Sequence, residues 1–233
     1  MAWRSHGRDQ QSLVDSLVNN GLIQTPRIET AFRRVDRGLF VDHDAYVDAP
    51  QLIGHNVTIS APHMHAHCTE LLRDHLVPGA RALDVGSGTG YLTCIFADLV
   101  CDGGRAESKG MAVGVDHVKE LVENSRIAER KAQAQNHRPW DVVLETADGR
   151  LGYSKFAPYD AIHVGAAAET VPKALLDQLK NGGRLVVPVG PEHGHQELQV
   201  IDKDAHGNIK VHSAMGVRYV PLTSFQHQKT GVY

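Results

Sequence analysis

Residues 83–91 read Leu83-Asp84-Val85-Gly86-Ser87-Gly88-Thr89-Gly90-Tyr91, a short apolar run that ends in three closely spaced glycines. A strand that ends in glycines and turns into a helix lets the backbone approach a ligand closely. The first N–H groups of that helix favour a carboxylate or a phosphate. The spacing is G-x-G-x-G, whereas the dinucleotide fingerprint is G-x-G-x-x-G. We therefore expect a Rossmann-like fold and do not expect a dinucleotide.

Acidic residues stand at three predicted strand ends around this loop. Asp84 lies two positions before the first glycine, Asp116 closes the next apolar run, and Asp148 follows the third. A carboxylate at the second strand end commonly accepts hydrogen bonds from ribose hydroxyls, and one at the third could bind an adenine amino group. An acid beside the glycines suits a ligand with a cation there, and S-adenosylmethionine carries both an ammonium group and a carboxylate. Ordinary turn residues would explain any one position, so the prediction rests on all three.

Short apolar runs alternate with helical patterns from residue 80 onward. Strands are predicted over 82–86, 111–115, 141–144, 160–164 and 184–189, with helices over 90–100, 118–135 and 171–179. This alternation predicts an α/β fold with a mostly parallel sheet and helices on both faces. The apolar runs 198–201 and 209–212 flank the turn-forming residues 204–208. They predict an antiparallel C-terminal hairpin.

The first 79 residues predict a helical extension. The spacing of apolar residues indicates helices near 13–18, from Thr25-Pro26 to about Gly38, and over 61–76. Residues 40–60 show no clear period and predict a loop with short extended pieces. We expect residues 1–233 to form a single domain, in which 1–79 carry an active-site segment and 80–233 form the Rossmann-like core. The polar, glycine-rich stretch 101–110 predicts a surface loop.

Composition excludes several classes of protein. Hydrophobic residues make up 42% of the 233 residues and charged residues 22%, so the chain suits one sizeable core. The 24 Lys and Arg against 27 Asp and Glu give a net charge of −3, which argues against binding to nucleic acid or to an anionic membrane. No apolar stretch approaches about 18 residues, and the N-terminus lacks a signal-peptide core. The three cysteines contain no C-x-x-C pair, so we expect a cytosolic protein without a disulfide framework.

The segment before the predicted third helix carries Ser60 and three alternating histidines. Ser60 could serve as a helix N-cap, with Pro62 in the first turn, and this role would account for it without catalysis. His63, His65 and His67 raise the question of zinc. Residues two apart do not share a helix face, and no further ligand completes the set, so no metal site is expected.

Several segments carry a resemblance to a known family. They are Thr58-Ile59-Ser60-Ala61-Pro62-His63-Met64-His65-Ala66, the glycine loop 83–90, Asp148-Gly149-Arg150, Tyr159-Asp160-Ala161-Ile162-His163-Val164-Gly165-Ala166-Ala167-Ala168, Gly183-Arg184-Leu185 and Tyr219-Val220-Pro221-Leu222-Thr223. These segments resemble the protein-L-isoaspartate (D-aspartate) O-methyltransferases, over nearly the whole chain to about residue 223. The resemblance implies a class I methyltransferase fold. It also implies methyl transfer from S-adenosylmethionine to the free carboxyl of L-isoaspartyl and D-aspartyl residues in damaged proteins and peptides, with S-adenosylhomocysteine as product. The methyl ester then collapses to a succinimide, which reopens partly to normal aspartate.

The same resemblance implies roles for individual residues. Ser60 is the implied catalytic residue. The implied contacts to the cofactor come from Val57, Thr58, Ile59, Ser60, His65, Asp84, Gly86, Gly88, Thr89, Asp116, Asp148, Gly149, Thr223 and Gln228. The implied contacts to the substrate come from Ala61, Val164, Gly165, Ala166 and Ala167. The chain departs from the family pattern at His55-Asn56, at Glu169 and in the longer loop 101–110, and the first two departures lie near implied peptide contacts.

Other functions fit parts of the pattern. A methyltransferase for RNA or a small molecule would share the cofactor loop, but the acidic balance and the 6% aromatic content disfavour RNA. A nucleotide-dependent oxidoreductase lacks its glycine spacing here. A non-catalytic cofactor-binding adaptor is disfavoured by the presence of Ser60 together with the intact loop. No apolar interface is evident, so we expect a monomer.

Overall fold

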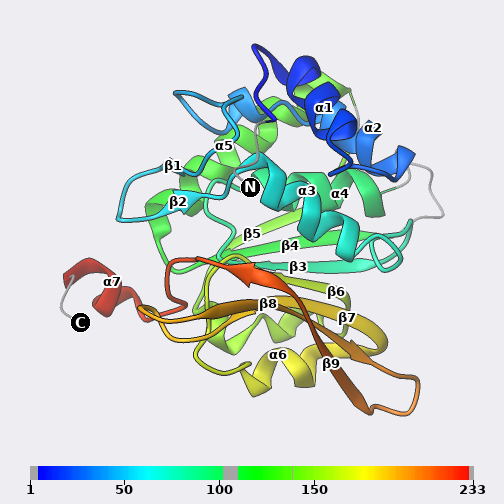
Figure 1. Ribbon diagram of the computed structural model, residues 1–233, viewed down its shortest axis with the longest axis vertical. Helices are drawn as coiled ribbons and strands as arrows, with labels where there is room; N and C mark the ends of the chain where they lie inside the picture. The colour runs from blue at the N-terminus through cyan, green and yellow to red at the C-terminus, as the bar shows by residue number, and fades with distance from the viewer. Residues whose placement is uncertain (1–4, 102–109, 138, 231–233) are drawn as a thin grey trace.

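A seven-stranded sheet forms the centre of the fold (Figure 1). The structure is a computed structural model, and it describes residues 5–101, 110–137 and 139–230. The strands of this sheet are β3 (Arg81–Val85), β4 (Met111–Asp116), β5 (Val142–Thr146), β6 (Tyr159–Val164), β7 (Leu179–Val189), β8 (Gln196–Lys203) and β9 (Ile209–Val217). Their order is β5-β4-β3-β6-β7-β8-β9, with parallel pairing from β5 to β7 and antiparallel pairing for β8 and β9. The chain reverses direction across the sheet at β3, and such a switch point opens a crevice at the carboxyl ends of the strands.

Helices cover both faces of this sheet. The helices are α1 (Gln10–Asn19), α2 (Pro26–Arg34), α3 (Pro62–Leu71), α4 (Tyr91–Val100), α5 (Lys119–Asn136), α6 (Lys173–Gln178) and α7 (Phe225–Thr230). Three 3₁₀ turns (Arg37–Leu39, Gly149–Leu151 and Ser154–Phe156) and a small antiparallel pair, β1 (Gln51–Leu52) and β2 (Thr58–Ile59), complete the described elements. Figure 1 shows α1 to α5 above the sheet and α6 below it. No helix in the described ranges is long and apolar enough to cross a membrane.

Successive residues of the central strands point to opposite faces of the sheet and belong to two separate apolar cores. Ala82 faces the core shared with α1, α2 and α4, whereas Leu83 faces the core shared with α6. This alternation is the period of two that a pleated strand imposes. All ten residues of α4 are buried, because the N-terminal helices cover the side of α4 that faces away from the sheet. The N-terminal helices therefore share one continuous core with the sheet.

The predicted fold class is confirmed: the sheet is mostly parallel, the N-terminal extension is helical, and the C-terminal hairpin is antiparallel. Some predicted boundaries were wrong. The second helix stops at Arg34 because Val35 is extended, and Asp36 then accepts a hydrogen bond from Gly38 N (2.9 Å) to begin a separate 3₁₀ turn. The helix predicted to run to residue 76 ends at Leu71. Of the predicted surface loop 101–110, residues 102–109 lie outside the described ranges.

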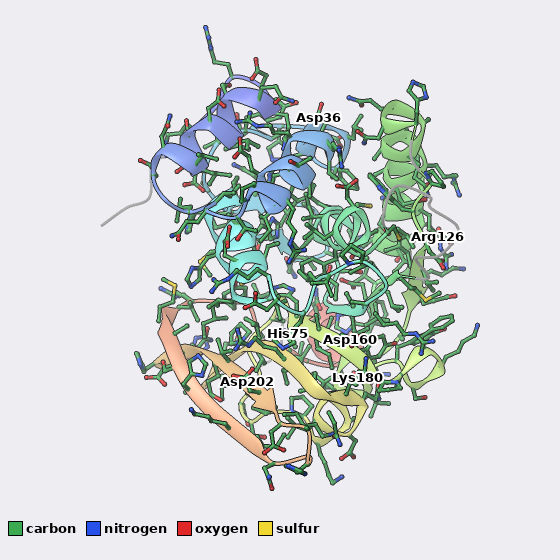
Figure 2. The ribbon with its side chains drawn as sticks, turned by 90° about the vertical axis from the view of Figure 1, so that its right-hand side faces the viewer. Asp36, His75, Arg126, Asp160, Lys180 and Asp202 are labelled. Atoms are coloured by element: carbon green, nitrogen blue, oxygen red, sulfur yellow. The ribbon has the colours of Figure 1, made fainter. Side chains whose placement is uncertain are left out.

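The side chain of Arg184 joins the N-terminal extension to the sheet. Arg184 on β7 donates to both carboxylate oxygens of Asp202 on β8, at 2.7 and 3.1 Å, and to the carbonyl oxygen of Leu71 at the end of α3, at 2.8 Å. Figure 2 labels Asp202 beside His75, which follows α3, and shows Asp160 and Lys180 at the neighbouring strand ends. Lys180 donates to Asp160 and so links β7 to β6. These contacts anchor the end of the sheet opposite the glycine loop.

The start of α2 is held by a carboxylate from another helix. Thr25 is the N-cap of α2, but its side chain makes no capping bond. Instead, the carboxylate of Glu70 on α3 accepts from Gln24 N, Thr25 N and the Thr25 hydroxyl, each at 2.8 Å. The carboxylate therefore satisfies the main-chain donors that lead into α2 and joins the two helices.

We expect Glu70→Ala to lower the free energy of unfolding by about 2 kcal/mol, because it removes charge-assisted hydrogen bonds and leaves partly buried donors without a protein partner. Glu70→Gln keeps one acceptor oxygen and should cost about 1 kcal/mol. Urea denaturation followed by circular dichroism measures both changes. The control is Glu123→Ala on the exposed face of α5, which should stay within about 0.5 kcal/mol of the unsubstituted protein. Equal losses for Glu70→Ala and the control would contradict this account.

Candidate functional site

The carboxyl ends of three strands are tied together around the glycine loop. Gly86 N and Ser87 N both donate to the carbonyl oxygen of Val115 on β4, at 2.9 and 3.0 Å, and Gly165 N after β6 donates to Val85 O at 2.8 Å. The three loop glycines have φ angles of 73°, 52° and 80°. Side chains rarely adopt this left-handed region, so the sequence needs glycine at these positions. The loop therefore presents bare backbone to the crevice.

Asp116 organises the loop from the end of β4. One of its carboxylate oxygens accepts from Gly88 N at 3.0 Å, and the other accepts from Val118 N at 2.9 Å. The side chain is buried, and burial raises the pKa of Asp116 above its usual range despite these two hydrogen bonds. A carboxylate has about four acceptor positions, so Asp116 keeps capacity for hydroxyl donors from a ligand.

Asp84 forms a buried pair with His163. Its carboxylate accepts from the Thr93 hydroxyl at 2.7 Å and lies 2.9 Å from Nδ1 of His163 on the adjacent strand β6. Burial lowers the pKa of His163, but the bond to Asp84 and the neighbouring Cys68 thiol outweigh it and raise the pKa to about 10. The imidazole is therefore protonated at neutral pH and balances the charge of Asp84.

A cavity of about 610 Å³ opens at these strand ends. Its inner wall comes from the glycine loop and the ends of β4 and β6, and its outer wall comes from β9 and the segment that follows it. Ser60, Thr58, Gly86 and Gly165 line both this cavity and a small adjoining pocket. The small pocket also contains His65, Asp84, Ser87, Gly88 and Thr89. These shared residues place Ser60 at the junction of the two spaces.

Ser60 is not a helix cap. The N-cap of α3 is Ala61, and it makes no side-chain bond, so the structural role proposed for Ser60 from the sequence is wrong. The carbonyl oxygen of Ser60 instead accepts from Arg37 at 2.8 Å. Its hydroxyl neighbours the hydroxyl of Tyr219, whose pKa is raised by burial and by the adjacent Cys68 thiol. Tyr219 is therefore protonated at neutral pH and can share a hydrogen bond with Ser60.

The three alternating histidines have separate surroundings. Nδ1 of His63 lies 2.7 Å from the buried carboxylate of Asp48, and Nδ1 of His65 lies 3.1 Å from Arg37. His67 keeps Nε2 buried without a hydrogen-bond partner among the described residues. No group of three or more His, Cys, Asp or Glu within the described ranges could hold a metal ion.

The structure gathers most of the predicted site residues at these two spaces. Those that line the larger cavity are Val57, Thr58, Ser60, Ala61, Gly86, Asp116, Gly149, Gly165, Ala166, Thr223 and Gln228. Those that line the small pocket are Thr58, Ile59, Ser60, His65, Asp84, Gly86, Gly88, Thr89 and Gly165.

Three predicted residues line neither space. Asp148 accepts a bidentate pair of hydrogen bonds from Arg150, with its closest nitrogen at 2.6 Å. Val164 is fully buried, and Ala167 exchanges main-chain hydrogen bonds with Val220 and Leu222, at 2.8 and 2.7 Å. Asp148 precedes Gly149, which lines the cavity, so the predicted segment is present although the side chain turns to Arg150.

Gln228 extends the site to the C-terminal helix. Its side-chain oxygen is hydrogen-bonded to Nε2 of His117 after β4, and its amide donates to the carbonyl oxygen of His55 at 3.0 Å. His55 and Asn56 form the turn between β1 and β2 with positive φ angles. Of the residues at the first two departures from the family pattern, Asn56 lines the cavity, whereas His55 and Glu169 do not.

Sequence reasoning assigned no role to Arg37, Cys68 or Tyr219, although Tyr219 begins a segment quoted for its family resemblance. These residues lie far apart along the chain, and none stands in a spacing that indicates a site. His163 is part of a segment quoted for its family resemblance, but its ion pair with Asp84 joins two strands 79 residues apart. A prediction of strand order would have been needed to find this pair.

The fold and the site together define a Rossmann-like methyltransferase, with a glycine loop between β3 and α4 and a carboxylate at the end of β4. The family model for protein-L-isoaspartate(D-aspartate) O-methyltransferase (PCMT) matches residues 8–227. The chain therefore belongs to the protein-L-isoaspartate(D-aspartate) O-methyltransferase family, and the resemblance seen in the sequence is confirmed.

Individual relatives agree with this assignment. The chain is 50% identical over 224 residues to protein-L-isoaspartate O-methyltransferase 1 of Arabidopsis thaliana, covering 95% of this chain and 94% of the relative. It is 47% identical over 228 residues to the Caenorhabditis elegans protein-L-isoaspartate O-methyltransferase, covering 98% of each. Among solved structures, a Plasmodium falciparum protein-L-isoaspartate O-methyltransferase in complex with S-adenosyl-L-homocysteine superposes with a TM-score of 0.83 at 32% identity, covering 93% of this chain and 99% of that one.

The residues present suit S-adenosylmethionine, the cofactor of this family. The Ser87 hydroxyl is buried in the glycine loop without a partner among the described residues, which marks a polar position left for a ligand. The pocket also combines the carboxylate of Asp84 with loop N–H groups at the start of α4. The carboxylate of Asp84 suits an ammonium group, the loop N–H groups suit a carboxylate, and Asp116 at the end of β4 suits ribose hydroxyls.

We expect the affinity for S-adenosylhomocysteine to fall as the pH is lowered from 7 to about 5. The raised pKa of Asp116 means that this carboxylate takes up a proton at a higher pH than an ordinary aspartate, and its protonated form is a weaker acceptor. In Asp116→Asn the affinity at pH 7 should be about tenfold lower, and its decline with pH should disappear.

Calorimetric titration at several pH values measures both effects. Asp148→Asn is the matched control, because the ion pair with Arg150 lowers the pKa of Asp148. This variant should keep the decline of the unsubstituted protein. A decline that persists in Asp116→Asn would assign the pH dependence to another group.

Proposed function

We propose that this chain transfers the methyl group of S-adenosylmethionine to the free carboxyl of L-isoaspartyl and D-aspartyl residues in proteins and peptides. The observation that carries the proposal is the position of Ser60, which lines both the small pocket beside the glycine loop and the larger open cavity. A cofactor at the loop and a peptide in the open cavity would meet at this residue. Membership of the family supports the choice of substrate.

We assign the cofactor to the inner side of the site. The side chains of Asp84, Asp116 and His65 would contact it, together with the main chain of the glycine loop and of Gly149. Thr58 and Ile59 form strand β2, which lies over the loop, and Gln228 anchors the C-terminal helix beside His117. The remaining proposed contacts come from Val57, Asp148, Thr223 and the main chain of Ser60.

We assign the acceptor peptide to the outer side, beside Ala61, Gly165 and Ala166. These residues are small, so the cavity wall admits a peptide backbone closely. Ala167 and Val164 support that wall from behind, since Ala167 is hydrogen-bonded to the segment after β9 and Val164 is buried within β6.

The bound cofactor supplies a methyl group on a sulfonium, which a nucleophile can take by direct displacement. The acceptor carboxyl has a pKa of about 4, so it is ionised at neutral pH and needs no general base. The task of the protein is therefore to orient one carboxylate oxygen and to exclude water from it. The Ser60 hydroxyl can donate to the acceptor while the Tyr219 hydroxyl donates to Ser60. Arg37 holds the carbonyl oxygen of Ser60, so the backbone at this residue is fixed.

Selectivity follows from where the carboxylate lies. An isoaspartyl residue carries its main chain through the side-chain carbonyl, which leaves the α-carboxylate free on a short arm. A normal aspartyl residue on the same backbone would place its carboxylate about a bond length away from that position. A misplacement of about 1 Å can lower the rate on the order of a hundredfold.

We further propose that the chain works as a single-domain monomer in the cytosol and binds neither nucleic acid nor membrane. The continuous core between the N-terminal helices and the sheet supports one domain. The net charge of −3 supports the absence of electrostatic binding to polyanions.

We expect labelled methyl to pass from S-adenosylmethionine to an isoaspartyl peptide at least about a hundredfold faster than to the aspartyl peptide of the same sequence. Scintillation counting of the methylated peptides, with a total RNA sample and small carboxylic acids as further acceptors, measures this selectivity. Equal labelling of the two peptides, or labelling of RNA alone, would contradict the proposed function.

Ser60→Ala should lower kcat by about ten- to a hundredfold, because the acceptor loses a hydrogen bond to a charged oxygen. The dissociation constant for S-adenosylhomocysteine should change less than about twofold, the expected result if the hydroxyl serves the acceptor and not the cofactor. Steady-state kinetics and calorimetry on the same preparation separate the two quantities. Ser213→Ala, at an exposed position of β9, is the matched control and should behave as the unsubstituted enzyme. A normal kcat in Ser60→Ala would remove the hydroxyl from the proposed mechanism.

A further inference from the structure

Arg37 is a buried cation next to the site. Its side chain has no exposed surface, and no carboxylate of the described residues forms an ion pair with it. It donates to the carbonyl oxygen of Ser60 at 2.8 Å, lies 3.1 Å from Nδ1 of His65, and packs over the ring of Tyr91 with 5.2 Å to the ring centre. The carboxylate of Asp48 attracts this charge from beyond ion-pair distance. A buried charge without a directly paired counter-ion is costly, so a side chain kept in this state is expected to have a task.

The contact with Arg37 determines which nitrogen of His65 carries the proton. A guanidinium has five N–H donors and no acceptor. Nδ1 of His65 must therefore accept, so the ring is neutral and its proton resides on Nε2. His65 lines the small pocket, and Nε2 has no hydrogen-bond partner among the described residues. The ring consequently offers the pocket an N–H donor.

We propose that Arg37 is a positioning residue that locks His65 in the Nε2–H tautomer, so that His65 donates a hydrogen bond to the carboxylate of the cofactor's amino-acid end. This inference rests on the proposed function, because it takes the small pocket as part of the cofactor site. Asp84 lines the same pocket and suits the ammonium group of that end. Together, one donor and one acceptor match the two opposite charges of an amino acid.

The surroundings of His65 support a fixed neutral ring. Burial lowers the pKa of His65 well below its usual value, and the charge of Arg37 lowers it further, with smaller contributions from His163 and His63. Tyr91 packs against the ring at 5.5 Å between ring centres. Asp84 is the acid of the same pocket, but it is engaged with His163.

Arg37 itself stays charged. Burial lowers its pKa to about 10, which still leaves the guanidinium protonated at neutral pH. Arg37 therefore stays a hydrogen-bond donor to His65, and keeps the ring in the Nε2–H tautomer, over the physiological pH range.

The first test reads the tautomer directly in the free protein. Long-range ¹H–¹⁵N correlation spectra of ¹⁵N-histidine-labelled protein distinguish a protonated nitrogen from a bare one in each ring. The signal missing from His65→Gln assigns His65. We expect one neutral Nε2–H form from pH 5.5 to 8. An Nδ1–H form, or titration of His65 near the ordinary value of about 6.5, would overturn the proposal. This spectrum needs no substrate, so its result is independent of whether isoaspartyl peptides are methylated.

The second test compares two ligands on one substitution. Arg37→Met keeps much of the side-chain volume but removes the donor, and we expect the dissociation constant for S-adenosylhomocysteine to rise about tenfold, the factor of about one hydrogen bond. The dissociation constant for 5′-methylthioadenosine, which lacks the amino-acid end, should change less than about twofold. An equal loss for both ligands would show a general structural role and would overturn the proposal.

Arg34→Met is the matched control. Arg34 ends α2 near Arg37, but its side chain is 39% exposed and pairs with Asp98 at 3.3 Å, away from the cavity. Both ligands should bind this variant as they bind the unsubstituted protein. If Arg37→Met does not fold, the spectrum of the unsubstituted protein decides the question alone.

Discussion

The hydrogen bonds that join the carboxyl ends of β4, β3 and β6 are the constraint on which the rest of the site depends. Val115 O holds two consecutive N–H groups of the glycine loop, and Val85 O holds Gly165 N. Because the strand order reverses at β3, the chain leaves β3 toward α4 on one face of the sheet and leaves β6 toward α6 on the other face. The crevice is thus a consequence of topology. Asp116 then fixes the middle of the loop through Gly88 N. These few main-chain contacts position both the part of the cavity proposed for the cofactor and the part proposed for the acceptor.

The N-terminal extension supplies a further wall of the cavity, and a buried arginine is hydrogen-bonded to the main chain there. Arg37 joins the carbonyl oxygen of Ser60 to the ring of His65. The site therefore contains a buried cation on the extension and a charge-balanced pair, Asp84 with His163, on the sheet. Charges held by the protein in this way need no rearrangement when ligands arrive, which is the condition for electrostatic preorganisation. An acceptor that is itself ionised benefits because its partners are already placed.

The sequence predicted those parts of the molecule that have local signals. The glycine loop, the alternation of strands and helices, and the acids at strand ends are readable because each depends on neighbours within a few residues. The boundaries at Arg34 and Leu71 were missed because backbone turns there are set by contacts such as Asp36 with Gly38 N. Ser60 was read as a cap because Pro62 follows it, but the chain begins α3 one residue later.

The remaining site residues could not be predicted because they are brought together by packing. Arg37 lies 23 residues from Ser60 and is joined to it across a segment with no period. Tyr219 reaches Cys68 only because the segment after β9 passes beside α3. Asp148 does follow a strand, as the sequence predicted. Its side chain, however, is hydrogen-bonded to Arg150 and does not line the cavity. Side-chain direction depends on partners that the sequence does not reveal.

The central claim is that one cavity holds the cofactor at the glycine loop and the acceptor carboxylate at Ser60. A crystal structure of the protein with S-adenosylhomocysteine and an isoaspartyl peptide tests it most directly. The account predicts the ribose hydroxyls at Asp116, the amino-acid end of the cofactor product in the pocket of Asp84 and His65, and the free α-carboxylate of the peptide within hydrogen-bonding distance of the Ser60 hydroxyl. A peptide carboxylate bound away from Ser60, or a cofactor product bound outside the crevice at β3, would contradict it.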